Sequence, residues 1–143
     1  MRNVLNCAIL VVLSFCVFGC SAKVKTEHVE GTVTYKGAPL EGAHLSFLPM
    51  DSEGSLPASG ITDAQGKYVT QTQAVGSGTT PGEYKVSISK TIEIPQPAGS
   101  EYTLPRSEEV LPTVYNNVSK TPLRATVRAG GPNVFDFNLV DKP

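Results

Sequence analysis

The amino-acid sequence predicts an all-β protein, a sandwich of about seven short strands. From residue 29 onward, short runs of alternating apolar and polar residues follow one another, and this period of two is typical of half-buried strands. The 13 glycines and 11 prolines separate these runs with turns. None of the runs has the periodicity of an amphipathic helix.

Length and charge exclude several other classes of protein. The 143 residues, of which 40% are hydrophobic and 17% charged, suit one globular domain. Because 12 basic residues stand against 13 acidic ones, we expect no nucleic-acid partner. The three cysteines, Cys7, Cys16 and Cys20, lie at the N-terminus, so a disulfide framework is not expected in the sandwich.

The first 19 residues have the pattern of a signal peptide. Arg2 supplies a positive charge, and residues 4–18 are apolar apart from Asn6 and Ser14. As a helix, this apolar run would measure about 22 Å, whereas the hydrocarbon core of a bilayer is about 30 Å thick. We therefore expect a cleaved export signal rather than a membrane span.

The end of this segment, Val17-Phe18-Gly19-Cys20, resembles the lipobox of bacterial lipoproteins: an aliphatic residue, a tolerant position, a small residue and a cysteine. The resemblance implies cleavage between Gly19 and Cys20, followed by acylation of Cys20. Two or three acyl chains would hold the protein on the cell membrane or the outer membrane. Residues 20–28 are then a tether. An ordinary secretory signal with a chance cysteine, or an uncleaved anchor, is the alternative.

The next runs predict two strands. Residues 29–35 alternate, with Val29, Gly31, Val33 and Tyr35 on one face. A turn rich in glycine and proline then returns the chain into a second strand over residues 44–48.

Turn chemistry predicts a tight hairpin formed by residues 59–62 and 67–71. In its turn, Asp63 would accept hydrogen bonds from backbone amides and Gly66 would take a positive φ. A Pro-Gly turn at residues 81–82 then starts the clearest strand, residues 83–89.

The last predicted pair of strands is residues 123–128 and 134–139, joined by a turn over residues 130–133. The apolar residues of the first strand are expected to face those of the second. These residues are Leu123, Ala125 and Val127 in the first strand, and Phe135, Phe137 and Leu139 in the second.

Residues 91–121 form a long loop in this interpretation, which is unusual in a compact domain. The loop is either a functional excursion or a packed cover over a sheet edge. We favour packing, with Leu111 and Tyr115 pinned to the sandwich.

Residues 33–43, 62–68 and 81–86 together resemble the carboxypeptidase regulatory-like domain, a member of the transthyretin-like (Ig-like) group of seven-stranded sandwiches. The order and spacing of three turn motifs carry this resemblance. It implies that residues 29–143 form one such sandwich, a non-catalytic accessory module.

The residues with chemical potential do not form a recognisable catalytic or metal-binding pattern. His28 is expected in the tether and His44 at the surface, and a zinc site would need more ligands. The turn over residues 63–66 lacks the alternating oxygen ligands of a calcium-binding loop, so Asp63 is expected to be a turn residue. The adjacent pair Glu108-Glu109 is expected to be exposed to solvent. We therefore expect no enzyme, no metal and no cofactor.

Two functions follow as expectations. The first is a structural or protein-interaction module that uses a sheet edge or the 91–121 loop to pair with an extended segment of an envelope protein. The alternative is glycan binding, in which sugar rings stack on exposed aromatic residues. The chain has no tryptophan, so Tyr102 and Tyr115 are the candidate ligand contacts.

Overall fold

The computed structural model describes residues 24–51, 54–73, 76–95 and 106–142. The predicted signal peptide, its cleavage site at Gly19 and Cys20, and Tyr102 lie outside the described residues. Within the described part, no helix is long and apolar enough to cross a membrane.

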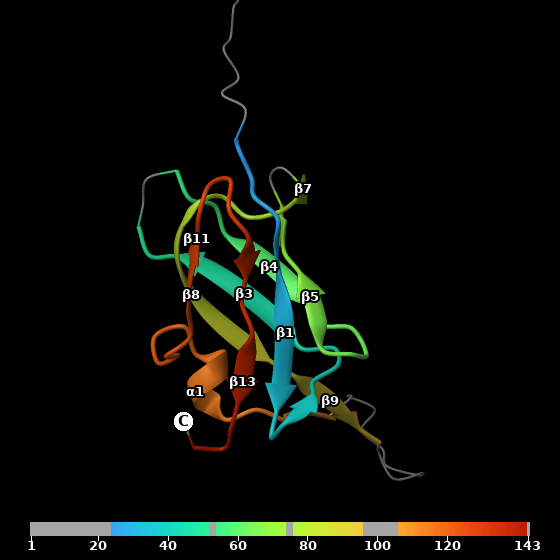
Figure 1. Cartoon of the computed structure of the whole chain (residues 1–143). Helices are drawn as coiled ribbons and strands as arrows, with labels where there is room; N and C mark the ends of the chain where they lie inside the picture. The colour runs from blue at the N-terminus through green and yellow to red at the C-terminus, as the bar shows by residue number, and fades with distance from the viewer. Residues whose placement is uncertain (1–23, 52–53, 74–75, 96–105, 143) are drawn as a thin grey trace, which may run out of the picture.

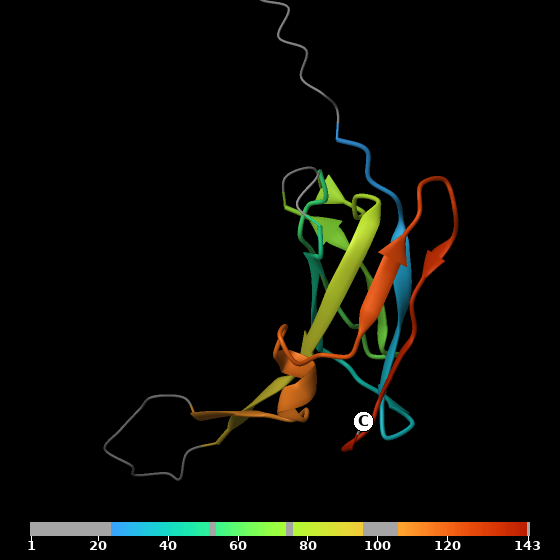
Figure 2. The ribbon, with the colours of Figure 1, turned by 90° about the vertical axis from the view of Figure 1, so that its left-hand side faces the viewer.

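The predicted all-β sandwich is confirmed, and two sheets face each other (Figures 1 and 2). The larger sheet has the order β11-β8-β3-β4-β6-β7. Its strands are β3 (His44–Pro49), β4 (Ala58–Ile61), β6 (Gln71–Thr72), β7 (Gly76–Ser77), β8 (Gly82–Ser89) and β11 (Arg124–Val127).

The smaller sheet is built around β1, which pairs antiparallel with β2 and β5 and parallel with β12 and β13. Its strands are β1 (Val29–Tyr35), β2 (Ala38–Pro39), β5 (Lys67–Val69), β12 (Asn133–Val134) and β13 (Phe137–Leu139). The described residues form more and shorter strands than the expected seven; β12 and β13, for example, are separate because the Asp136 side chain replaces a backbone partner between them.

The alternation of apolar and polar residues correctly predicted which side chains of β1, β3 and β8 point into the core. Val29 and Val33 of β1, Leu45 and Phe47 of β3, and Tyr84, Val86 and Ile88 of β8 are all buried. At the centre, Phe47 contacts three other aromatic rings, Tyr68, Tyr84 and Phe137, with ring centroids 6.1, 6.2 and 6.5 Å away.

The predicted hairpin at residues 59–71 is correct in its turn and in the pairing of Ser59 with Gln71, but β4 and β5 do not pair with each other. Asp63 Oδ1 accepts hydrogen bonds from the amides of Gln65 and Lys67, each 2.9 Å long, and Gly66 has a φ of 73°. However, β4 belongs to the larger sheet and β5 pairs with β1. The arms separate because the Tyr68 ring enters the core between the sheets.

The last two predicted strands also lie in different sheets. β11 pairs antiparallel with β8, whereas β12 and β13 pair with β1. The buried side chain of Asn133 closes the connection: its Oδ1 accepts from Arg128 N at 2.8 Å and its Nδ2 donates to Arg128 O at 3.0 Å. The apolar residues of both segments still belong to one core.

The described residues of the 91–121 segment include regular secondary structure. β9 (Thr91–Ile94) and β10 (Arg106–Glu109) form a two-stranded ladder that extends away from the sandwich, and α1 (Thr113–Asn116) follows it (Figures 1 and 2). The prediction that Leu111 and Tyr115 pack is confirmed, since they are 4% and 2% exposed.

The C-terminal end is fastened to β1 by polar contacts. The Tyr35 hydroxyl donates to Asp141 Oδ1 at 2.5 Å, and Lys36 Nζ lies 2.9 Å from Asp141 Oδ2. The Tyr35 hydroxyl, together with the Lys36 ammonium, lowers the pKa of the Asp141 carboxyl below its usual range.

Tyr115 provides a test of this packing. Because its ring is buried and its hydroxyl accepts from Val140 N at 3.1 Å, Tyr115→Ala should lower the free energy of unfolding by about 3 kcal/mol or more. Tyr115→Phe, the matched control, should lose only about 1 kcal/mol. Urea denaturation of the full chain measures both, and an unchanged midpoint for the alanine variant would contradict the assignment.

Candidate interaction surface

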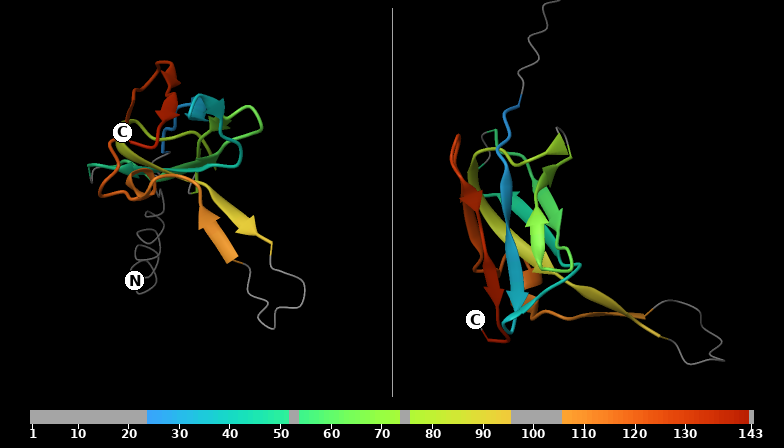
Figure 3. Two further views of the ribbon diagram at one scale, coloured as in Figure 1. Left: turned by 90° about the horizontal axis from the view of Figure 1, so that it is seen from below. Right: turned by 45° about the vertical axis from the view of Figure 1, so that its right-hand side comes forward.

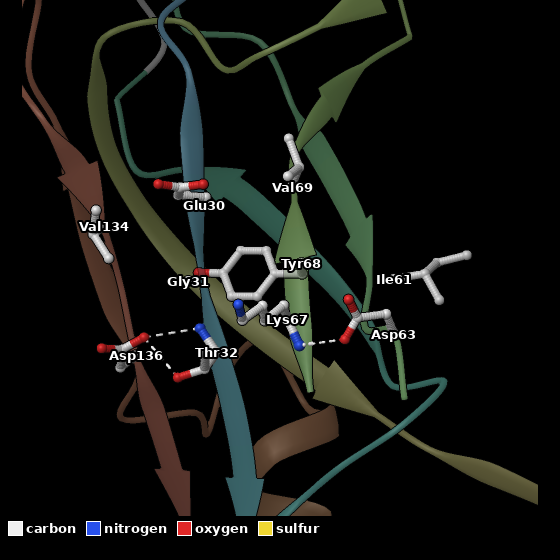
Figure 4. Close-up of a pocket in the computed structure, with 10 residues that line it drawn as sticks. All are labelled: Glu30, Gly31, Thr32, Ile61, Asp63, Lys67, Tyr68, Val69, Val134 and Asp136. Atoms are coloured by element: carbon white, nitrogen blue, oxygen red, sulfur yellow. Dashed lines mark hydrogen bonds between the residues drawn. The ribbon is translucent and has the colours of Figure 1, made fainter. Parts of the chain in front are cut away.

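An open hollow lies on the outer face of the smaller sheet (Figure 4). It has a volume of about 530 Å³. β1 and β5 form its floor, the segment from β12 to β13 forms one wall, and the end of β4 forms the other. The side chains that define it are Glu30, Thr32, Ile61, Asp63, Lys67, Val69, Val134 and Asp136.

One wall of the hollow is made by an interrupted parallel ladder. Phe135 N donates to Glu30 O at 2.9 Å, which is the regular pattern for the Glu30–Val134 register. A continuing ladder would have Thr32 N donate to Phe135 O. Instead, Thr32 N donates to Asp136 Oδ1 at 2.8 Å, and the Thr32 hydroxyl donates to the same oxygen at 2.7 Å.

The displaced carbonyl of Phe135 turns inward and accepts from the Tyr68 hydroxyl at 2.8 Å. Tyr68 reaches it across Gly31, because a Cβ on Gly31 would lie 1.9 Å from Phe135 O and 3.0 Å from the Tyr68 hydroxyl oxygen. Burial, and to a smaller extent the Asp136 carboxylate, raises the pKa of Tyr68, so its hydroxyl stays a hydrogen-bond donor.

Exposed aliphatic side chains gather at this hollow. Of the seven large hydrophobic residues exposed in the described part of the chain, three line it: Ile61 is 58% exposed, Val69 is 45% and Val134 is 54%. They come from three separate strands. Clustered apolar surface of this kind is a common mark of a binding site.

The charges of the hollow are mainly negative. Glu30, Asp63 and Asp136 contribute carboxylates, and Lys67 contributes an ammonium group. Asp63 and Asp136 are held in place by their bonds to backbone amides. The surface therefore combines fixed negative charge with aliphatic contacts, which suits a ligand that presents an apolar group beside a positive one.

The candidate residues from the sequence lie elsewhere. The burial of Tyr115 removes its ring from any ligand surface. Every aromatic ring that the structure describes is buried or partly buried. In the same part of the chain, no three His, Cys, Asp or Glu side chains come together as a metal site would require. His28 and His44 are exposed, as predicted.

Two polar residues have roles that the sequence did not reveal. The Asp136 carboxylate takes the place of a backbone carbonyl as the acceptor for Thr32 N. In the sequence, the only indication of this role is that an acidic residue stands between two phenylalanines. Glu109 was expected to be solvated, but its Oε1 accepts from Lys90 N at 2.7 Å and from Leu111 N at 3.2 Å. It therefore fixes the base of the β9–β10 ladder.

No family model, curated protein or solved structure matches this chain. The fold and the surface define an all-β sandwich with an open acidic and aliphatic hollow.

Gly31 tests the geometry of the wall. Gly31→Ala should lower the free energy of unfolding by about 2 kcal/mol, because the new methyl group meets the Phe135 carbonyl. Gly131→Ala is the matched control, since the nearest atom to its Cβ lies 3.9 Å away, and it should change stability by less than about 0.5 kcal/mol. Equal stabilities for the two variants would refute the close approach.

Proposed function

We propose that this chain is an exported lipoprotein, anchored through acyl chains on Cys20, whose non-catalytic sandwich is a protein-interaction module of the cell envelope. The observation that supports an interaction role is the gathering of Ile61, Val69 and Val134 at one acidic hollow. A matching partner presents an aliphatic side chain flanked by lysine or arginine.

The N-terminal chain is compatible with such an anchor. The backbones of Glu27 and Thr79 exchange hydrogen bonds of 2.8 and 2.9 Å, so the chain is held to the sandwich just before β1. The seven residue-to-residue steps from Cys20 to Glu27 could extend at most about 25 Å. The hollow lies on the long side of the sandwich, beside β1, and not at the end from which the N-terminal chain leaves (Figures 1 and 4). A partner beside the protein could therefore reach it.

The anchor has a direct test. Intact mass spectrometry of the chain expressed in a bacterial host should find a mature protein that begins at Cys20 and carries two or three acyl chains. Cys20→Ser should block both acylation and cleavage. A mature protein with an unmodified Cys20, or with a different first residue, would contradict the proposed anchor.

The interaction has a separate test in the native envelope. A photo-crosslinking residue in place of Val69 should capture one envelope protein about tenfold more efficiently than the same residue in place of Glu83, which is exposed on the other sheet. Adding Val134→Lys should abolish this adduct, because it introduces a positive charge into the hollow. If Val134→Lys leaves the yield of the adduct unchanged, the role of the hollow is refuted. A glycan adduct would favour glycan binding, the alternative function.

A further inference from the structure

The β9–β10 ladder extends away from the sandwich as a separate two-stranded sheet (Figure 2). Within the described residues, β10 pairs with β9 alone. Arg106, Ser107 and Glu108 of β10 are exposed, and Ile92 of β9 is 46% exposed. An isolated two-stranded ribbon is only marginally stable in water, so further pairing would stabilise it.

The hydrogen-bond pattern shows which groups of β10 face outward. Val110 N donates to Lys90 O at 2.8 Å, in register with the Glu109–Thr91 and Glu108–Ile92 pairs. Hydrogen-bonded pairs alternate along an antiparallel ladder, so Glu108 and Arg106 bond to β9. Ser107 therefore turns its N–H and C=O away from β9, toward the free edge.

We infer that β10 pairs with β10 of a second copy of this chain, antiparallel and centred on Ser107. The two Ser107 residues then exchange N–H···O=C bonds across a two-fold axis. This register places Arg106 of each copy opposite Glu108 of the other. Opposite charges at directly facing positions stabilise a sheet, and here the symmetry provides the pair twice.

The sequence favours pairing centred on Ser107 over pairing centred on the other residues whose backbone groups face outward. Pairing centred on Glu109 would place two glutamates opposite each other, and Glu109 already accepts bonds at the base of the ladder. Pairing of β9 centred on Glu93 would also oppose two glutamates. Ser107 is small and uncharged, and it is flanked by residues of opposite sign.

The orientation of the ladder is compatible with two copies on one membrane, and this step alone rests on the proposed anchor. Seen from below, β9 and β10 lie side by side and face-on (Figure 3, left), whereas Figure 2 shows them close to edge-on and extending sideways. The two-fold axis of an antiparallel pair is perpendicular to the ribbon. It therefore runs roughly along the length of the sandwich, and both N-terminal chains leave from the same end.

The pairing also extends the face of the ladder that carries Ile92 and Ile94. Residues that are directly opposite in a ladder lie on the same side, so Ile92 and Ile94 share a face with Glu108 and Arg106. In the pair of copies, the two Arg106–Glu108 pairs lie on the central strands of this four-stranded ribbon, and the two isoleucines of each chain lie on the outer strands. On the lone ribbon, Ile92 is 46% exposed and Ile94 is partly buried.

Charge reversal tests the proposal with full chains carrying two different affinity tags in detergent. Wild-type chains should co-purify with each other. Arg106→Glu should weaken its self-association about tenfold, and Glu108→Arg should do the same, because each places like charges opposite each other twice. A mixture of the two variants should recover the wild-type yield, since every facing pair is then Glu with Arg.

The controls separate pairing from folding. Both variants should unfold at the wild-type temperature, because the side chains lie outside the core. Arg128→Glu, an exposed charge reversal next to β11, should leave self-association unchanged. The proposal is overturned if wild-type chains do not co-purify, if single variants associate like wild type, or if the mixture is not restored. Each result is independent of Cys20 acylation and of the hollow's partner.

Discussion

The packing of strand β1 is the constraint on which most of this structure depends. β1 pairs antiparallel with β5 on one side and parallel with the C-terminal strands on the other, so it joins residues from both ends of the chain. Gly31 lets the Tyr68 hydroxyl and the Phe135 carbonyl meet beneath β1, where a side chain would block them. This meeting removes the ladder acceptor for Thr32, and Asp136 replaces it. The carboxylate at the rim of the hollow is thus a consequence of how the core is closed.

The sequence predicted the fold class, the inward faces of β1, β3 and β8, and the Asp63–Gly66 turn, because each depends on local pattern. It did not predict strand partners. Alternation indicates that Ala125 and Phe137 face a core, but it does not indicate whether their strands are neighbours in one sheet or belong to opposite sheets. Loop chemistry favoured hairpins, yet the Tyr68 ring and the Asn133 side chain redirect the chain between sheets. These are contacts between residues distant in sequence, or side-chain bonds that no periodicity reports.

The candidate surface was missed for a related reason. Ile61, Val69 and Val134 each occupy an outward position of a separate strand, where a single exposed aliphatic residue is ordinary. They become a cluster through the register of β1 with β5 and β12 and through the approach of the end of β4. The aromatic residues behave in the opposite way. Tyr115 was predicted both as a packing anchor and as a ligand contact, and the structure uses its ring to anchor α1 in the core.

In the described part of the chain, two sheet edges carry clear charge patterns, and these patterns have opposite consequences for pairing. β11 carries Arg124 and Arg128 at and beside an exposed edge, and like charges of this kind discourage pairing between copies. β10 carries Arg106 and Glu108 on either side of Ser107, so an antiparallel second copy meets complementary charges. When a strand edge pairs with the same edge of a second copy about a two-fold axis, one partner covers it completely. Assembly therefore stops at two copies instead of continuing as a filament. Glu109 fixes the base of the ladder to Lys90 and Leu111. The ribbon extends on the side of the sandwich opposite β1, which carries the hollow, so the two surfaces can be occupied independently (Figure 2).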